Sequence, residues 1–181
     1  MHWFALTVKA QHEKAVAAQL AAKSVEAYVP LYRSLRRWSD RAKTIDSPLF
    51  SRYVFCRFRF EQRFEVLGIP SVTSIVGFGG APFPVSETEI DIIRRMVDCG
   101  LPIMPWPFVR IGQGVRISKG PLAGLEGILA KEKAAYRVVV NVEMLQRAVA
   151  VEIERHLLEP IASSRNELSG IALSATAGAR P

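Results

Sequence analysis

The stretch from Lys119 to Gly127, KGPLAGLEG, decides how the second half of the chain folds. It holds three glycines and one proline, and it lies between GVRIS and GILAKE, two runs whose alternating apolar residues are typical of strands. Gly120 and Gly127 allow backbone conformations that a residue with a Cβ resists, and Pro121 stiffens the turn. The stretch therefore predicts a sharp bend between two strands.

Two leucines inside this bend, Leu122 and Leu125, need a separate explanation. An ordinary surface turn is polar, so apolar side chains at these positions serve either a partner or a core. One interpretation presents Leu122 or Leu125 at the rim of a small barrel, where a partner contacts it. The alternative is that one of the two plugs the barrel interior.

The surrounding residues predict the barrel itself. Between Gly112 and Ile161, the runs GVRIS, GILAKE, YRVVVNV and RAVAVEI alternate and are separated by glycine or polar turns. Although EMLQRAVAVEIERHLLE is rich in helix formers, its alternation from Arg147 onward favours a strand. Residues 100–111 carry three prolines and predict a stiff linker, and residues 162–181, rich in Ser, Ala and Gly, predict a disordered tail.

The first 99 residues have a different pattern, in which strands alternate with helices. Strands are expected at HWFALTV, EAYVPLY, FSRYVFCRF and SVTSIV, with helices at QHEKAVAAQLAAKS and EQRFEVLG. A further helix begins at Ser86, which forms a capping box with Glu89. The order β-α-β-β-α-β-α indicates an α+β fold, a ferredoxin-like α/β sandwich with its helices on one side of an antiparallel sheet.

Charge is concentrated in the first third of the chain. Up to Phe60 there are 11 Lys and Arg against 4 Asp and Glu, so these residues carry the whole net charge of +7. The densest part, RSLRRWSDRAK from Arg33 to Lys43, surrounds Trp38 with cations and predicts an exposed loop or hairpin. Such a surface suits a nucleic-acid backbone, although a merely solvated loop is the alternative.

Several classes of function find no support in the sequence. No apolar run is long enough to span a membrane and no leader is recognisable, so a cytoplasmic protein is expected. Cys56 and Cys99 are far apart and are expected to be buried free thiols rather than metal ligands. The GFGG run is followed by two prolines instead of a helix, which excludes a dinucleotide site. No catalytic constellation, metal site or cofactor site is expected.

The motifs in their order resemble the NusG family of transcription elongation factors. They are WFALTVKAQHEKAVAAQL, YVPLY, WSDRAK, PLFSRYVFCRF, SVTSIVGFGGAPFPVSETEI and GVRISKGPLAGLEGIL. WSDRAK and PLFSRYVF look more like the specialised antiterminators of the RfaH and UpxY type. The resemblance implies an RNA-polymerase-binding NGN domain at 1–99, a linker at 100–111 and an SH3-like KOW β-barrel at 112–161. Such factors suppress pausing or termination, and this chain is expected to be a monomer.

The resemblance also implies the site residues. In the family an aromatic patch of the NGN domain docks on RNA polymerase, and the matching positions are Trp3, Phe4, Phe50, Tyr53 and Phe55. Alternation places Tyr53 and Phe55 on one face of their strand and Val54 and Cys56 on the other. If helices cover the Val54 face, Tyr53 and Phe55 are exposed; otherwise the aromatics form a core.

Two further contacts follow from the family. Specialised members touch the non-template DNA strand of the transcription bubble, for which the candidates are Lys9, Lys14, Arg36, Arg37 and Arg41. The KOW motif at Gly120, Pro121, Leu122, Leu125 and Gly127 is expected to recruit a ribosomal protein or the termination factor Rho. We expect the barrel to rest away from Tyr53 and Phe55, leaving the polymerase site open. The alternative function is a general KOW-type nucleic-acid or ribosome-binding protein.

Overall fold

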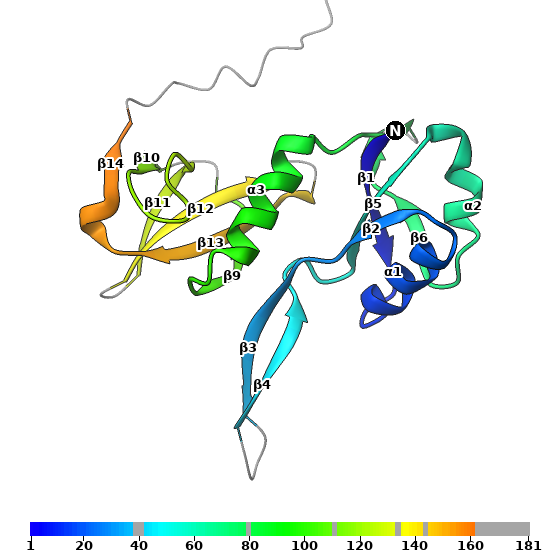
Figure 1. Ribbon diagram of the computed structural model, residues 1–181, viewed down its shortest axis with the longest axis horizontal. Coiled ribbons are helices and arrows are strands. Elements are labelled where there is room, and N and C mark those ends of the chain that lie inside the picture. The colour runs from blue at the N-terminus through cyan, green and yellow to red at the C-terminus, as the bar shows by residue number, and fades with distance from the viewer. Residues whose placement is uncertain (38–41, 79–80, 110–111, 133–134, 143–144, 162–181) are drawn as a thin grey trace, which may run out of the picture.

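The structure is a computed structural model that describes residues 1–37, 42–78, 81–109, 112–132, 135–142 and 145–161. It contains an N-terminal α/β unit and a C-terminal β unit, with one long helix between them (Figure 1). The predicted tail at 162–181 and the tip of the basic hairpin at 38–41 lie outside the described residues.

The N-terminal unit is built on a four-stranded antiparallel sheet. Its strand order is β2 (Glu26–Tyr28), β5 (Tyr53–Phe58), β1 (His2–Val8) and β6 (Val72–Ile75). Helix α1 (Glu13–Ala22) connects the first two of these strands along the chain, and the short helices η1 (Phe60–Gln62) and α2 (Arg63–Leu67) precede β6. This order and connectivity confirm the predicted ferredoxin-like sandwich.

The two faces of this sheet are covered by different helices. On one face, Phe4, Leu6, Val54 and Cys56 form an apolar core with α1 and α2. The other face carries Trp3, Ala5 and Phe55, which pack with Ile90 and Ile93 of α3 (Glu87–Asp98). The prediction that all helices lie on one side was therefore wrong. Helix α3 has buried positions at 90, 93 and 96, so its apolar stripe needed a sheet face as well.

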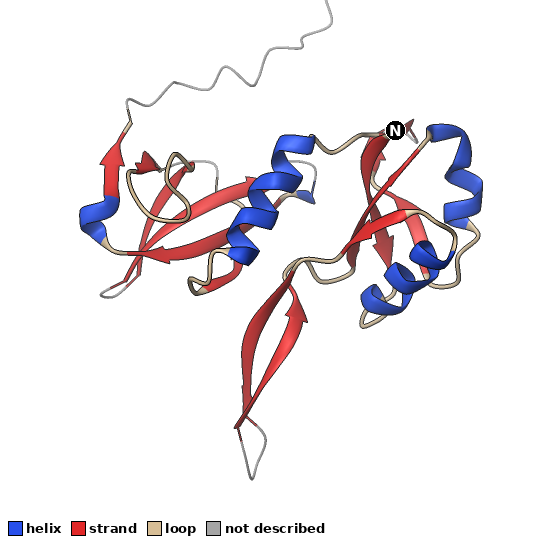
Figure 2. Ribbon diagram, viewed as in Figure 1, coloured by secondary structure: helices blue, strands red, loops and turns tan. Residues whose placement is uncertain are grey.

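Two hairpins project from the N-terminal sheet. Strands β3 (Leu31–Arg37) and β4 (Ala42–Pro48) form a long antiparallel ribbon that points away from both units (Figure 2). A smaller hairpin pairs β7 (Gly77–Phe78) with β8 (Ala81–Pro82) and leads into α3. The first ribbon contains the predicted basic hairpin, so that element is confirmed.

The C-terminal unit is a six-stranded antiparallel sheet around an apolar core. Its order is β14 (Leu158–Pro160), β10 (Gln113–Ile117), β11 (Glu126–Glu132), β12 (Ala135–Val142), β13 (Arg147–Ile153) and β9 (Ile103–Pro107). A 3-10 turn, η3 (Arg155–Leu157), precedes the last strand. Strand β13 confirms that the alternation from Arg147 onward outweighs the helix propensity of the same residues.

Residues 103–107 of the predicted stiff linker form a strand of the C-terminal sheet, contrary to our prediction. Strand β9 pairs with β13, placing Pro105 opposite Val149 and Pro107 opposite Arg147. Proline is tolerated there because β9 is the outermost strand, where a backbone nitrogen facing away from the sheet needs no ladder hydrogen bond.

The two units are packed together, so the predicted separation of the barrel from the aromatic strand was also wrong. One continuous apolar cluster contains Trp3, Phe50 and Phe55 of the first unit and Val138 and Val151 of the second. Helix α3 contributes Ile90, Ile93 and Met96 to this cluster. The same helix also makes a polar contact with the second unit, because the exposed Arg95 guanidinium donates a hydrogen bond to the Ala123 carbonyl (3.1 Å).

The KGPLAGLEG stretch forms the predicted bend, but it turns its leucines inward. Leu122 and Leu125 are both buried in the core. The Ile117 amide donates to the Leu125 carbonyl (2.9 Å) and the Gly124 amide donates to the Ile117 carbonyl (2.8 Å), which folds the loop back onto β10. The plug interpretation therefore holds for both leucines, because a loop tied back in this way directs its apolar side chains into the barrel.

The glycines of this loop are needed for different physical reasons. Gly120 and Gly124 have φ angles of +87° and +82°, and a Cβ there would meet no atom within 4 Å. Gly127 lies in β11, where a Cβ would fall 2.6 Å from Val138 Cγ1 and 2.7 Å from the Val139 carbonyl oxygen. Only Gly127 is required by close packing between strands.

These geometries predict different costs for the same substitution. We expect Gly127→Ala to lower the free energy of unfolding of the C-terminal unit by roughly 3 kcal/mol, because its Cβ overlaps the neighbouring strand. Gly124→Ala, the matched control, is expected to cost about 1 kcal/mol, since only its left-handed backbone resists a Cβ. Urea unfolding followed by far-UV circular dichroism measures both. Equal losses in the two variants would contradict this assignment.

Candidate functional site

The predicted polymerase-binding aromatics do not form an exposed patch. Trp3, Phe4, Phe50 and Phe55 are buried, with Phe55 fully inaccessible, and Tyr53 is half-buried. Phe4 faces α1 on the sheet face opposite Phe55, and its ring centre lies 4.7 Å from that of Phe58 in a tilted arrangement. The alternation of Tyr53 and Phe55 against Val54 and Cys56 was correct, but the second face was not free, because α3 covers it.

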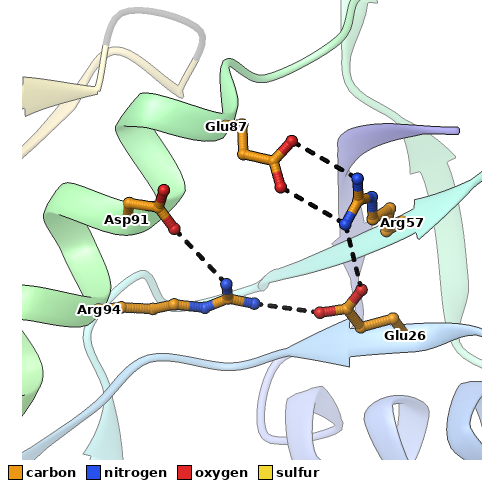
Figure 3. Close-up of polar contacts among 5 residues, drawn as sticks. All are labelled: Glu26, Arg57, Glu87, Asp91 and Arg94. Atoms are coloured by element: carbon orange, nitrogen blue, oxygen red, sulfur yellow. Dashed lines mark hydrogen bonds and ion pairs between the residues drawn. The ribbon is translucent and has the colours of Figure 1, made fainter.

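A polar network holds α3 over this aromatic face (Figure 3). Arg57 of β5 reaches Glu87 at the start of α3 (3.4 Å) and Glu26 of β2 (3.9 Å). Arg94, two turns further along α3, contacts the same Glu26 (3.2 Å) and its own neighbour Asp91 (3.6 Å). Glu26 therefore bridges two arginines, one from the sheet and one from the helix. Each pair is partly exposed, so the network positions α3 more than it stabilises it.

Arg94 also covers two aromatic rings, those of Trp3 and Tyr28. Its guanidinium carbon lies 5.1 Å from the centre of the Trp3 ring and 5.3 Å from that of Tyr28. Burial raises the pKa of Tyr28 to about 12, the charge of Asp98 adds to the rise, and Arg94 opposes it. Tyr28 is consequently a neutral packing group at physiological pH.

A groove of about 710 Å³ remains where the two units meet at the base of the long hairpin. Tyr32 and Phe50 line it from the N-terminal unit, and Trp106 and Arg147 line it from the C-terminal unit. Tyr53 does not line the groove, but it is half-buried against the apolar cluster that contains Phe50, and its amide donates to the Phe50 carbonyl (3.2 Å). Among the predicted aromatics, Phe50 and Tyr53 are thus the ones at the boundary between the units.

The predicted nucleic-acid-binding residues fall into two neighbouring groups. Lys9 and Lys14 are exposed near the start of α1, and the Lys14 ammonium donates to the Asp46 carbonyl of the hairpin (3.3 Å). Arg36 and Arg37 belong to β3, where they pair with Lys43 and Ala42 of β4, and Arg41 lies outside the described residues. The Lys14 contact brings the helix start and the hairpin base together.

One cation beside this surface was missed from the sequence. Arg52 is exposed, and its φ of +70° makes a tight turn just before β5. Its amide donates to Oε1 of Glu13 (2.7 Å), a carboxylate that is only 2% exposed. Glu13 therefore fixes the turn that carries Arg52 next to the start of α1. The isolated sequence signal, a Ser-Arg pair before the strand, was too weak to reveal it.

A second missed feature is a group of exposed apolar side chains on the N-terminal unit. They are Phe60, Phe64, Leu67, Phe78 and Phe83. Phe78 is 89% exposed. The Arg63 guanidinium carbon lies 4.4 Å from the Phe60 ring centre and 4.3 Å from that of Phe64. The four-residue spacing of Phe60 in η1 and Phe64 in α2 was a weak hint in the sequence.

At the KOW motif, the accessible part is the turn and not the leucines. Gly120 and Pro121 are exposed, whereas Leu122 and Leu125 are buried. Leu122 and Leu125 therefore cannot contact a partner directly in this structure, which corrects the rim interpretation. Gly127 is inside β11 and acts on packing alone.

The other expectations concern inorganic chemistry and membranes. Cys56 is a buried free thiol whose pKa is raised by burial, and Cys99 is a half-buried one. Within the described ranges, no group of His, Cys, Asp and Glu side chains could hold a metal ion. In the same part of the chain, no helix has the length and apolarity to cross a membrane.

Comparison with known proteins decides the family. The family model "Transcription termination factor nusG" matches residues 1–94, which include the sandwich and most of α3. The chain belongs to the NusG family. NusG-family proteins are transcription termination and antitermination factors rather than enzymes.

The relatives extend the match beyond the sandwich. The NusG protein of Lactococcus lactis is 29% identical over 174 residues, covering 88% of this chain and 92% of the relative. That of Neisseria meningitidis is 32% identical over 102 residues, covering 53% of this chain and 56% of the relative. A structure of Thermotoga maritima NusG, solved for its domain interaction, aligns with a TM-score of 0.57 at 22% identity, covering 89% of this chain and 97% of that one. The NGN and KOW folds are thus confirmed, and the narrower RfaH and UpxY type stays a prediction.

The environment of Tyr28 makes a pH prediction. Its pKa is near 10 in the unfolded chain and about 12 in the folded one. The unfolded chain therefore loses this proton first, and the stability that Tyr28 contributes is complete below pH 10 and lost as the pH rises to 12. We expect Tyr28→Phe to reduce the loss of stability between pH 10 and 12 in denaturation experiments. An unchanged pH profile would contradict the shift.

Proposed function

We propose that this NusG-family protein binds RNA polymerase through its N-terminal unit, suppresses pausing or termination, and recruits a second partner through its C-terminal unit. Family membership carries the proposal, because the matched residues 1–94 are the unit that bears the aromatic boundary and the basic hairpin. The alternative, a general KOW-type nucleic-acid or ribosome-binding protein, leaves the matched N-terminal unit without a role.

The polymerase contact that we propose is the boundary surface formed by Tyr32, Phe50 and Tyr53. Trp3, Phe4 and Phe55 belong to the core beneath it and serve as support. The groove of about 710 Å³ supports this choice, because the units are incompletely packed at this place. Polymerase docking then competes with the C-terminal unit for the same side of the sandwich.

The nucleic-acid contact that we propose is the basic surface of Lys9, Lys14, Arg36, Arg37 and Arg41, extended by Arg52. The backbone of the ribbon β3–β4, whose strand β3 ends in Arg36 and Arg37, extends away from both units (Figure 1). A projecting cationic ribbon suits the displaced non-template DNA strand, whose phosphates need no fixed base sequence to be recognised. Lys14 and Arg52, near the base of the ribbon, extend the same basic surface.

A pair of variants tests the polymerase contact. We expect Tyr53→Ala in the full-length chain to weaken polymerase affinity about tenfold or more, since a truncated aromatic anchor costs about 1 to 2 kcal/mol or more. Phe78→Ala is the control, because Phe78 is exposed on the small hairpin β7–β8 and does not belong to the apolar cluster that joins the two units. Binding is measured by fluorescence anisotropy with purified core polymerase.

The same assay tests the competition. Arg95→Ala removes the hydrogen bond to Ala123 and should strengthen polymerase binding severalfold, because a loosened C-terminal unit competes less. If Phe78→Ala weakens binding and Tyr53→Ala does not, the proposed surface is wrong and the exposed phenylalanines are the docking site.

The basic ribbon makes a prediction about salt. Replacing Arg36, Arg37 and Arg41 by Gln should weaken binding to a bubble-containing elongation complex most at low salt, and should reduce the slope of log affinity against log salt by roughly 2. Arg116→Gln on the C-terminal unit is the matched control, because that exposed cation is paired with Glu126. An equal loss with polymerase alone would point to a protein contact instead.

A further inference from the structure

The C-terminal unit carries two neighbouring hollows that the proposed function does not explain. One, of about 660 Å³, has a mainly apolar lining that includes Val115, Leu129 and Leu158. The other, of about 590 Å³, is lined by Pro121, Ile153 and Leu157 among others. Each is large enough to accept a side chain of a ligand.

A single pair of side chains separates the hollows. Tyr136 and Arg155 line both of them, and the Arg155 guanidinium carbon lies 5.9 Å from the centre of the Tyr136 ring. Arg155 is exposed. The two hollows are therefore halves of one groove that crosses a ridge formed by Arg155 on Tyr136.

The walls of the groove are held in place by hydrogen bonds. The Ser118 amide and hydroxyl both donate to the Leu157 carbonyl (2.8 and 3.0 Å), which ties η3 to the end of β10. The Ile161 amide donates to the Gly114 carbonyl (3.1 Å), which continues the pairing of β14 with β10. Fixed walls remove the cost of ordering the protein side of the groove when a ligand binds.

The charges around the groove are asymmetric. Of its carboxylates, Glu152 is paired with Arg137 (3.7 Å) and Glu154 lies 3.2 Å from His156. Lys119 and Arg155 have no carboxylate within ion-pair distance among the residues that the structure describes. Within the described part of the chain, the groove thus offers two cations without a carboxylate partner, against one carboxylate, Glu154, that is not paired with an arginine. Two such cations beside an apolar floor complement carboxylates next to aliphatic side chains.

The lining favours a protein over a nucleic acid. Single-stranded nucleic acid is bound by several open aromatic faces and a dense row of cations. Here the floor is aliphatic, and among the described lining residues Tyr136 is the only Phe, Tyr or Trp, with Arg155 over its ring.

We propose that this groove binds an extended protein segment that carries aliphatic side chains and carboxylates, with one aliphatic side chain in each hollow and acidic groups on Lys119 and Arg155. The inference rests on the proposed recruiting role of the C-terminal unit and gives that role a surface. Because η3 and β14 lie at the end of this unit far from the N-terminal sheet (Figure 1), the groove is accessible while the two units are packed together.

The test uses the full-length chain and a fluorescein-labelled peptide of about 12 residues that alternates Glu and Leu. Binding is followed by fluorescence anisotropy. Arg155→Ala and Lys119→Ala are each expected to weaken binding about tenfold, the effect of removing one charge-assisted contact. Both residues are exposed, so the variants are expected to fold, and Arg116→Ala is the matched control with unchanged affinity.

Two further probes decide the chemistry of the ligand. A peptide that alternates Lys and Leu should bind far more weakly, and single-stranded RNA should not bind in a way that depends on Arg155. Failure of the acidic peptide to bind, equal binding of the basic peptide, unchanged affinity in Arg155→Ala, or Arg155-dependent RNA binding would each overturn the inference. Polymerase binding of the same variants is measured in parallel, so a failure here with intact polymerase binding leaves the proposed function standing.

Discussion

The packing of α3 against the second face of the N-terminal sheet is the interaction on which the rest of the structure depends. Without it, Trp3 and Phe55 would form a water-exposed aromatic layer, and the C-terminal unit would lose the apolar side chains Ile90, Ile93 and Met96 on which it packs. Apolar burial supplies the free energy, whereas the bridging of Arg57 and Arg94 by Glu26 supplies the register of the helix. Apolar contacts alone tolerate sliding along a helix, but a carboxylate shared by two arginines does not.

This constraint explains why the aromatic residues divide into two roles. Phe55 and Trp3 are too deep to meet a partner, and their effect on binding passes through the shape of the surface above them. Phe50 lines the groove between the two units, and Tyr53 is half-buried against the same apolar cluster. Under the proposed function, a partner that needs these two residues must displace the C-terminal unit but need not disturb α3.

Local patterns predicted most of the fold, and the failures arose where distant segments meet. The alternation of Val54 against Phe55 and the Ser86–Glu89 capping box are short-range signals, and both held. The helix that covers a given face of a sheet is determined by contacts between distant parts of the chain, which periodicity does not reveal. The aromatic patch was therefore wrongly expected to be exposed. Pro105 and Pro107 suggested a linker because proline cannot donate a hydrogen bond inside a sheet. An edge strand does not need that hydrogen bond, and these prolines lie in one. Arg52 was missed because its turn is fixed by Glu13, a buried carboxylate that lies 39 residues earlier in the chain.

The short connection between the units limits how they can act. Helix α3 ends at Asp98 and β9 begins at Ile103, so only residues 99–102 join them. These span at most roughly 14 Å when extended. Cys99 is tied back to the Met96 carbonyl (3.0 Å), which leaves Gly100, with a φ of +74°, as the point where the backbone turns. So short a tether gives the C-terminal unit a high effective concentration at the boundary surface, which favours the packed state. Under the proposed function, release on polymerase is therefore a rotation about Gly100, and any partner recruited by the barrel stays close to the sandwich.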